Sequence, residues 1–130
     1  GVWYPDKDTE PDDGNPLVAL AFREYVIKRL GSGWTATGRE ERQLGEPDLL
    51  ALRDADEVRF DLVTCYRSRI FDKYLAYAKA EGNPFYVVFG LHGFADVPKF
   101  LFVLPLEKAV TDLKKSVLQQ YEIPADRDLF

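Results

Sequence analysis

The sequence has little of several residue types, and each shortage excludes a class of protein. Of its 130 residues, one is a cysteine, Cys65, and one is a histidine, His92. A single cysteine excludes an internal disulfide framework and a cysteine-rich zinc module. A single histidine argues against a histidine-based metal site or a Ser/His triad. No stretch approaches the roughly 18–20 consecutive apolar residues of a membrane span, so no membrane partner is expected. Carboxylates are left as the ligands that a metal would use.

Negative charge is in modest excess and is concentrated at one end. The formal net charge is −5, from 17 basic and 22 acidic residues. Residues 1–16 contain five acidic residues against Lys7 alone, a net of −4, so the other 114 residues hold −1. An acidic chain argues against nucleic acid as a partner, but a nearly neutral domain removes that objection. We expect residues 1–15 to form an acidic, flexible N-terminal arm.

The composition otherwise describes an ordinary globular chain. An apolar fraction of 46% is far too high for a disordered protein, and the length suits one domain. No secretory signal is visible and no cysteine pair can form, so an intracellular, cytoplasmic location is the expectation.

Hydrophobic periodicity predicts an α/β domain over residues 16–121, followed by a C-terminal tail at 122–130. Asn15 and Pro16 suit the cap and first position of a helix. Strands are expected where β-rich segments alternate or form short apolar runs. In order, the predicted elements are helix 17–30, strands 34–37, 48–53 and 57–65, helix 68–80, strands 85–90 and 100–104, and helix 106–121.

This order of elements predicts one mixed central sheet of about five strands flanked by helices. Because a helix connects the strands at 57–65 and 85–90, those two strands should run parallel. Residues 54–56 are expected to form a tight turn, and residues 91–99, which contain glycine, histidine and proline, a loop.

Three carboxylates stand out by position. Glu24 borders the apolar stripe of the first predicted helix, Asp48 opens a strand after Pro47, and Asp61 lies inside an apolar strand segment. A buried carboxylate needs a partner, because an uncompensated buried charge costs several kcal/mol. Two partners are open: a salt bridge to Arg59, Arg67 or Arg69, or a hard cation such as Mg²⁺ held by one or two carboxylates with waters and substrate phosphate.

Over about residues 16–120 the chain resembles the PD-(D/E)xK nuclease superfamily. Glu24, Pro47-Asp48 and Asp61 match, in order, the helix glutamate, the strand-opening aspartate and the carboxylate of the next strand in that family. The 13 residues from Asp48 to Asp61 allow one hairpin, which would bring both aspartates to neighbouring strands. The downstream segments YRSR, PFYVVFG and FLFVLPL are also similar to this family. The resemblance implies a restriction-endonuclease-like core and a Mg²⁺ or Mn²⁺ site formed by Glu24, Asp48 and Asp61.

The sequence departs from the family at one position. Two residues after Asp61, where the family has a lysine, stands Val63. In an active member that lysine would activate the attacking water and stabilise charge on the phosphorane, and valine does neither. Lys73 is the nearest candidate for a displaced catalytic cation; Arg67 and Arg69 are others, although arginine stays protonated and cannot act as a base.

The segment after the third predicted strand mixes cations with an aromatic residue. Tyr66, Arg67, Arg69 and Lys73 suit phosphate contacts and base stacking, so DNA is the expected partner. The alternative is a solvated helix start whose arginines pair with Asp72 or Asp61. His92 is expected to be a loop histidine and Cys65 a small core residue.

Two functional interpretations follow. The first is a divergent nuclease-family domain, a Mg²⁺-dependent hydrolase of DNA phosphodiesters. The second is a catalytically inactive nuclease-fold domain that binds nucleic acid or a protein partner, which Val63 favours. A homodimer and flanking domains are left open.

Overall fold

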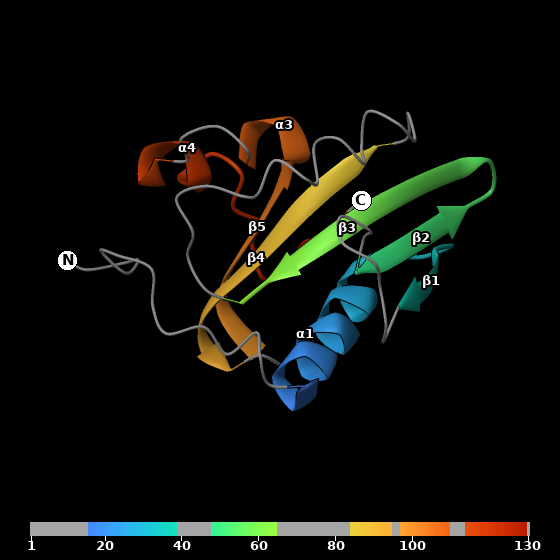
Figure 1. Cartoon of the computed structure of the whole chain (residues 1–130), viewed down its shortest axis with the longest axis horizontal. Coiled ribbons are helices and arrows are strands. Elements are labelled where there is room, and N and C mark those ends of the chain that lie inside the picture. The colour runs from blue at the N-terminus through green and yellow to red at the C-terminus, as the bar shows by residue number, and fades with distance from the viewer. Residues whose placement is uncertain (1–15, 39–47, 65–83, 95–96, 110–113, 130) are drawn as a thin grey trace.

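The computed structural model describes residues 16–38, 48–64, 84–94, 97–109 and 114–129 (Figure 1). Among them, five strands form one sheet in the order β1-β2-β3-β4-β5. The elements are α1 (Pro16–Arg29), β1 (Thr35–Gly38), β2 (Leu49–Arg53), β3 (Asp56–Val63), β4 (Phe85–Phe94), β5 (Val97–Pro105), α3 (Leu106–Ala109) and α4 (Lys115–Gln119). Strands β3 and β4 are parallel and the other neighbours antiparallel. The predicted mixed α/β sheet and its parallel pair are confirmed.

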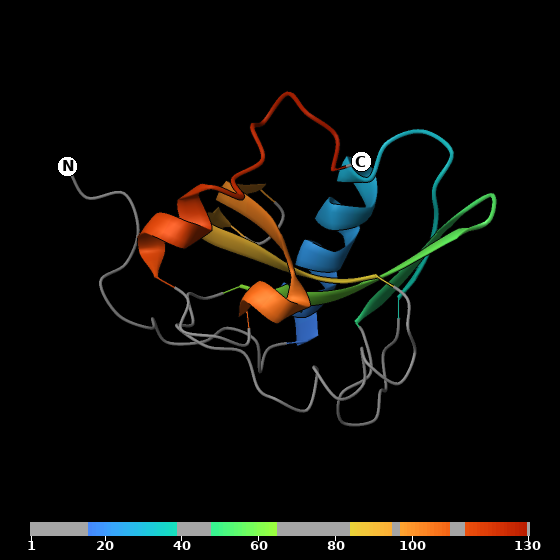
Figure 2. The same cartoon turned by 90° about the horizontal axis from the view of Figure 1, so that it is seen from above.

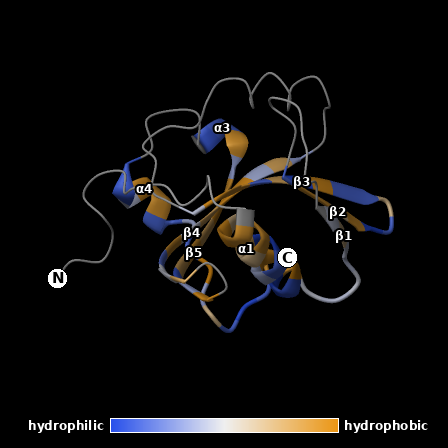
Figure 3. Cartoon of the chain, turned by 60° about the horizontal axis from the view of Figure 1, so that its bottom comes forward, coloured by the Kyte–Doolittle hydropathy of each residue, from blue (hydrophilic) through white to orange (hydrophobic). Residues whose placement is uncertain are grey.

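Side chains of β3 alternate between the two faces of the sheet, and the faces carry separate apolar clusters. Val58 and Phe60 pack with Phe22, Val26 and Leu30 on the face covered by α1. The other face lies under α3 and α4, and Figure 3 shows these helices and α1 on opposite sides of the strands. Its buried members are Val63, Phe85, Val87, Phe89, Leu91, Phe102, Leu104, Leu106 and Leu118.

A glycine in β4 allows α1 to lie close to the sheet. A Cβ atom built on Gly90 would lie 2.4 Å from Cε1 and 2.7 Å from Cζ of Phe22. Phe22 is 1% exposed, so its ring fills the space that any other residue at position 90 would need. The close approach of backbone and ring requires glycine here.

The loop predicted at 91–99 is wrong, because β4 continues to Phe94 and β5 begins at Val97. His92 and Gly93 have φ values of 61° and 72°, so the backbone irregularity lies inside the hairpin. Gly93 stands opposite Pro98 in the register. Glycine and proline commonly interrupt strands, but near the end of this hairpin both fit within a paired ladder.

The single helix predicted over 106–121 is also wrong. Lys114 has an extended backbone, with φ −80° and ψ 151°, and the described helical residues belong to α3 before it and α4 after it. Leu106 and Leu118 are both buried in the same cluster. One straight helix would separate these two leucines by about 18 Å along its axis, and the break lets both reach the cluster.

The segment after α4 packs on the domain and reaches α1. The Ile123 N–H donates to the Leu101 carbonyl oxygen at 2.8 Å, and the Leu129 N–H donates to the Arg29 carbonyl oxygen at 2.7 Å. The Arg29 guanidinium in turn donates to the carbonyl oxygen of Pro124 at 2.8 Å. Leu129 is 8% exposed. The residues predicted as a C-terminal tail therefore pass back across the molecule to the end of α1 (Figure 2).

Two predicted segments, the acidic arm at 1–15 and the helix at 68–80, lie outside the described residues. Of the helices that the structure describes, none is long and apolar enough to cross a membrane.

Candidate functional site

Asp48, which immediately precedes β2, lies beside the part of β3 that contains Asp61. The β2–β3 register ends at the pair Leu49–Phe60, and Asp48 is the residue before that pair. The Asp48 N–H donates to the Phe60 carbonyl oxygen at 2.9 Å. The Leu62 N–H donates to Asp48 Oδ2, also at 2.9 Å. The first hydrogen bond holds the Asp48 backbone on β3, and the second holds its carboxylate at the N–H of Leu62, the residue after Asp61.

Asp61 is buried, with 4% of its surface exposed. It stands between Phe60 and Leu62 on β3, and Phe60 belongs to the α1 side, so Asp61 lies on the opposite face. Asp48 is half-buried. A carboxylate with so little exposure keeps its charge only where nearby groups compensate it. The groups that compensate Asp61 must therefore reach the same face of the sheet.

Glu24 does not join the two aspartates. The buried side of α1 is formed by Phe22, Val26 and Leu30. Glu24 lies two residues from Phe22 and two from Val26, roughly 200° around the helix axis from each, and it is exposed. Helix α1 also covers the sheet face opposite to Asp61. Across the described ranges, no three His, Cys, Asp or Glu side chains gather closely enough to hold a metal ion. What the structure brings together is the Asp48–Asp61 pair.

Arg59, one of the three arginines predicted as a salt-bridge partner, is a charged neighbour of Asp61 on β3. It is 7% exposed and precedes Asp61 by two residues, so it lies on the same face of β3. Its Nη2 lies 3.3 Å from Oε1 of Glu57, two residues earlier again. The signal in the sequence was the period-two series Glu57, Arg59, Asp61, in which the charge alternates along one face of a strand.

The remaining predicted site residues lie outside the described ranges, and His92, which was not predicted as a site residue, lies away from the aspartates. Lys73, Tyr66, Arg67 and Arg69, predicted as the displaced cation and DNA contacts, fall within residues 65–83, which the structure does not describe. His92 is exposed near the end of β4, and its ring stands edge-on to Phe100, 5.8 Å between centroids.

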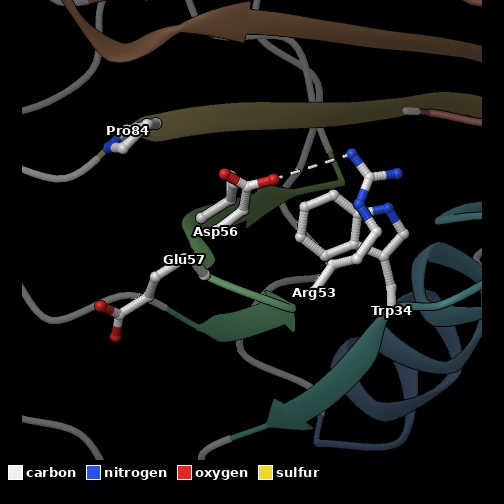
Figure 4. A pocket seen from close by; sticks show the side chains of 7 residues that line it. Trp34, Arg53, Asp56, Glu57 and Pro84 are labelled. Atoms are coloured by element: carbon white, nitrogen blue, oxygen red, sulfur yellow. Dashed lines mark ion pairs between the residues drawn. The ribbon is translucent and has the colours of Figure 1, made fainter.

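A shallow open pocket of about 300 Å³ lies at the turn between β2 and β3 (Figure 4). The Arg53 guanidinium carbon lies 4.5 Å from the centroid of the Trp34 ring, and Arg53 Nη2 lies 3.9 Å from Oδ2 of Asp56. Ala55, Glu57, Val58 and Pro84 complete its lining. The pocket contains neither Asp48 nor Asp61, and its cation is engaged in holding the hairpin against Trp34.

Comparison with known proteins identifies the fold. No family model matches the chain, and no curated protein matches it. Among solved structures it is similar to Hjc, a Holliday junction resolvase from the archaeal hyperthermophile Archaeoglobus fulgidus, with a TM-score of 0.54 and 14% sequence identity. The similarity covers 76% of this chain and 88% of the resolvase. The chain has a nuclease-like fold. The resemblance drawn from the sequence is confirmed at the level of the fold.

Val63, which stands where the sequence resemblance implies a lysine, is part of the core. Val63 is 6% exposed and packs in the cluster that contains Val87 and Phe89. The position therefore carries no cation and has little room for water.

The aspartate pair fits a hard divalent cation. Mg²⁺ prefers oxygen ligands and is commonly held by one or two carboxylates, the other positions being filled by water and substrate phosphate. Asp61 of β3 and Asp48, whose carboxylate accepts the N–H of Leu62, provide two carboxylates close to the same part of β3. One of the two Asp48 carboxylate oxygens, Oδ2, accepts the Leu62 N–H.

Proposed function

We propose that this chain is a divergent nuclease-fold domain that binds Mg²⁺ or Mn²⁺ at Asp48 and Asp61 and hydrolyses DNA phosphodiesters. The observation that carries the proposal is the proximity of these two residues: the Asp61 side chain is buried, and the Asp48 carboxylate is held by the N–H of Leu62, the residue after Asp61. The fold shared with a Holliday junction resolvase supports DNA, and branched DNA in particular, as the substrate class.

The chain's own residues divide the work in this proposal. A bound divalent ion would polarise the phosphoryl oxygens and lower the pKa of a coordinated water. Asp48 and Asp61 hold the cation, and the Leu62 N–H orients the Asp48 carboxylate. Lys73 is proposed as the displaced cation, and Tyr66, Arg67 and Arg69 as contacts to the DNA backbone and bases.

The second candidate function is DNA or protein binding without catalysis. It is favoured by Val63, which lies in the core where an active member of the family has its lysine. The two candidates share the aspartate pair and differ in turnover.

A metal titration tests the site. Because a ligand that binds only the folded state stabilises it, millimolar Mn²⁺ should raise the Tm of the parent chain by several degrees. The shift should be lost in the double variant Asp48→Asn plus Asp61→Asn. Asp56→Asn is the matched control, because it also neutralises an aspartate of β3, one whose side chain is 67% exposed and lies at the other end of the strand. No shift in the parent, or an equal shift in the double variant, refutes the metal site.

Cleavage assays then separate the two candidates. Four-way junctions and linear duplexes of the same sequence are incubated with the parent and with Asp61→Asn in Mn²⁺. Products that require Asp61 support the hydrolase. A parent that binds Mn²⁺ and DNA but leaves both substrates intact supports binding without catalysis.

A further inference from the structure

Two large apolar side chains are exposed together at the end of the β4–β5 hairpin. Phe94 is 78% exposed and Val97 is 64% exposed. They stand directly opposite each other in the register, so their side chains lie side by side. Single exposed apolar residues are ordinary on a protein surface, whereas contiguous exposed apolar surface marks places where other molecules bind.

The backbone presents these two side chains in a fixed arrangement. Gly93 has a φ of 72°, and a Cβ atom there would lie 2.8 Å from the Val97 carbonyl oxygen and 3.1 Å from the Lys99 nitrogen. Position 93 therefore requires glycine, because both the conformation and the space exclude a side chain. Phe94 and Val97 belong to a paired ladder, so little of the chain has to become ordered when a partner binds.

The two ends of the sheet differ in charge. Strands β3 and β4 are parallel, so the turn between β2 and β3 and the end of the β4–β5 hairpin lie at opposite ends of the sheet (Figure 1). The turn carries Asp54, Asp56 and Glu57 against one arginine, a net charge of −2, whereas β4 and β5 contain one lysine, Lys99, and no acidic residue. Asp96, between these two strands in the sequence, lies outside the described ranges. The hairpin end is therefore the end of the sheet that suits a polyanion.

Lys99 places its charge beside the aromatic residues of the hairpin. It is exposed, and its Nζ lies 5.5 Å from the centroid of the Phe100 ring. It follows Val97 by two residues, about 6.6 Å along the strand. An exposed aromatic ring with a cation close by is the combination that binds single-stranded nucleic acid, since a base stacks on the ring and the cation meets the phosphate.

We propose that the end of the β4–β5 hairpin binds an unpaired DNA base, which stacks on Phe94 beside Val97 while Lys99 contacts the phosphate. A base inside a duplex is already stacked on its neighbours, so this site favours unpaired DNA. Asp61 pairs with Val87 of β4, and Phe94 follows Val87 by seven residues, about 23 Å along the strand. Phe94 is therefore a binding residue that does not touch the reacting phosphate. This inference rests on the DNA ligand of the proposed function and is independent of its metal site.

The test compares binding to a single strand and to a duplex of the same sequence, measured by fluorescence anisotropy in EDTA so that no metal-dependent cleavage occurs. Phe94→Ala should weaken single-strand binding about ten-fold, because one stacking ring is lost, and should keep the duplex affinity of the parent. Leu17→Ala is the matched control, because it removes an apolar side chain of α1 that is 76% exposed, and it should leave both affinities unchanged. Lys99→Gln should weaken binding to both DNA forms and reduce the salt slope by about 1.

A conservative variant supplies a direct signal of stacking. Phe94→Trp keeps an aromatic ring at the hairpin end, so it should bind the single strand at least as tightly as the parent. The fluorescence of the added tryptophan should be quenched by the single strand and not by the duplex, because only an unpaired base stacks on the ring. Quenching by both DNA forms, or by neither, overturns the inference.

The other outcomes separate this site from the rest of the proposed function. Equal single-strand affinity of Phe94→Ala and the parent, or an equal loss for both DNA forms, overturns the role of Phe94 and leaves the metal site intact. Sedimentation in which Phe94→Ala turns a dimer into a monomer, with unchanged DNA binding, would show that a second copy covers the hairpin end, which also overturns it. A parent that gives no Mn²⁺ shift but binds single strands through Phe94 refutes the metal site and supports the hairpin site. A parent that binds neither DNA form refutes the DNA ligand and the hairpin site together.

Discussion

Substituting Gly90 by alanine tests how closely α1 packs on the sheet. The added Cβ would lie 2.4 Å from Cε1 and 3.1 Å from Cδ1 of the Phe22 ring, and no carbon pair approaches as closely as 2.4 Å without displacement. Overpacking of this kind costs about 1–3 kcal/mol. The same change restricts the unfolded chain, which stabilises the fold by about 0.4–1 kcal/mol. The steric effect is larger, so Gly90→Ala should lower the free energy of unfolding by about 1–2 kcal/mol.

Urea denaturation followed by circular dichroism measures this change, with the slope m expected to stay constant. Phe22→Leu supplies the control, because it removes ring atoms at the point of contact. Alone it should lower the free energy of unfolding by about 1–2 kcal/mol. The double variant with Gly90→Ala should lose less stability than the two single variants lose together. A Gly90→Ala protein as stable as the parent, or strictly additive costs, would refute the contact between Phe22 and β4.

Two further substitutions probe the site and the C-terminal segment. Val63→Lys places an ammonium at a position that is 6% exposed, so we expect the free energy of unfolding in urea to fall by about 2–4 kcal/mol. The fraction that stays folded should cleave junctions faster than the parent. Unchanged cleavage would mean that the site lacks more than its cation. Leu129→Ala should lower the free energy of unfolding by about 2 kcal/mol and speed amide exchange in residues 122–129. The control Leu17→Ala, at a leucine that is 76% exposed, should change it by less than about 0.5 kcal/mol. Equal stability of these two variants would contradict the packing of Leu129.

The parts of the fold that sequence reasoning predicts well are those governed by local rules. The first helix follows from its Asn15-Pro16 start and apolar spacing, and β2 and β3 from the turn at 54–56. The parallel pairing of β3 and β4 follows from the length and character of the connection between them. The proximity of Asp48 and Asp61 was predictable from their spacing, since 13 residues leave room for one hairpin only.

The parts that it misses depend on contacts distant in sequence. Periodicity continues through residues 106–121, but Leu106 and Leu118 reach one cluster because the helix is broken at Lys114. Glu24 has the order expected of a family glutamate, and only the orientation of α1 against the sheet shows that it lies away from the aspartates. The sequence shows that position 59 is a charged residue, but the burial of Arg59 depends on what covers that face of β3.

The hydrogen bond between Leu129 and Arg29 has a consequence for how the chain folds during synthesis. It joins residues that are 100 positions apart, and the Arg29 carbonyl is among the last of α1, which have no partner within the helix. A growing chain can form α1 and the β2–β3 hairpin early, because their contacts are local. The end of α1 gains this partner only when residue 129 has left the ribosome. Completion of the domain is therefore a late event, and shortened chains would present an open end of α1 and uncovered apolar surface to other molecules.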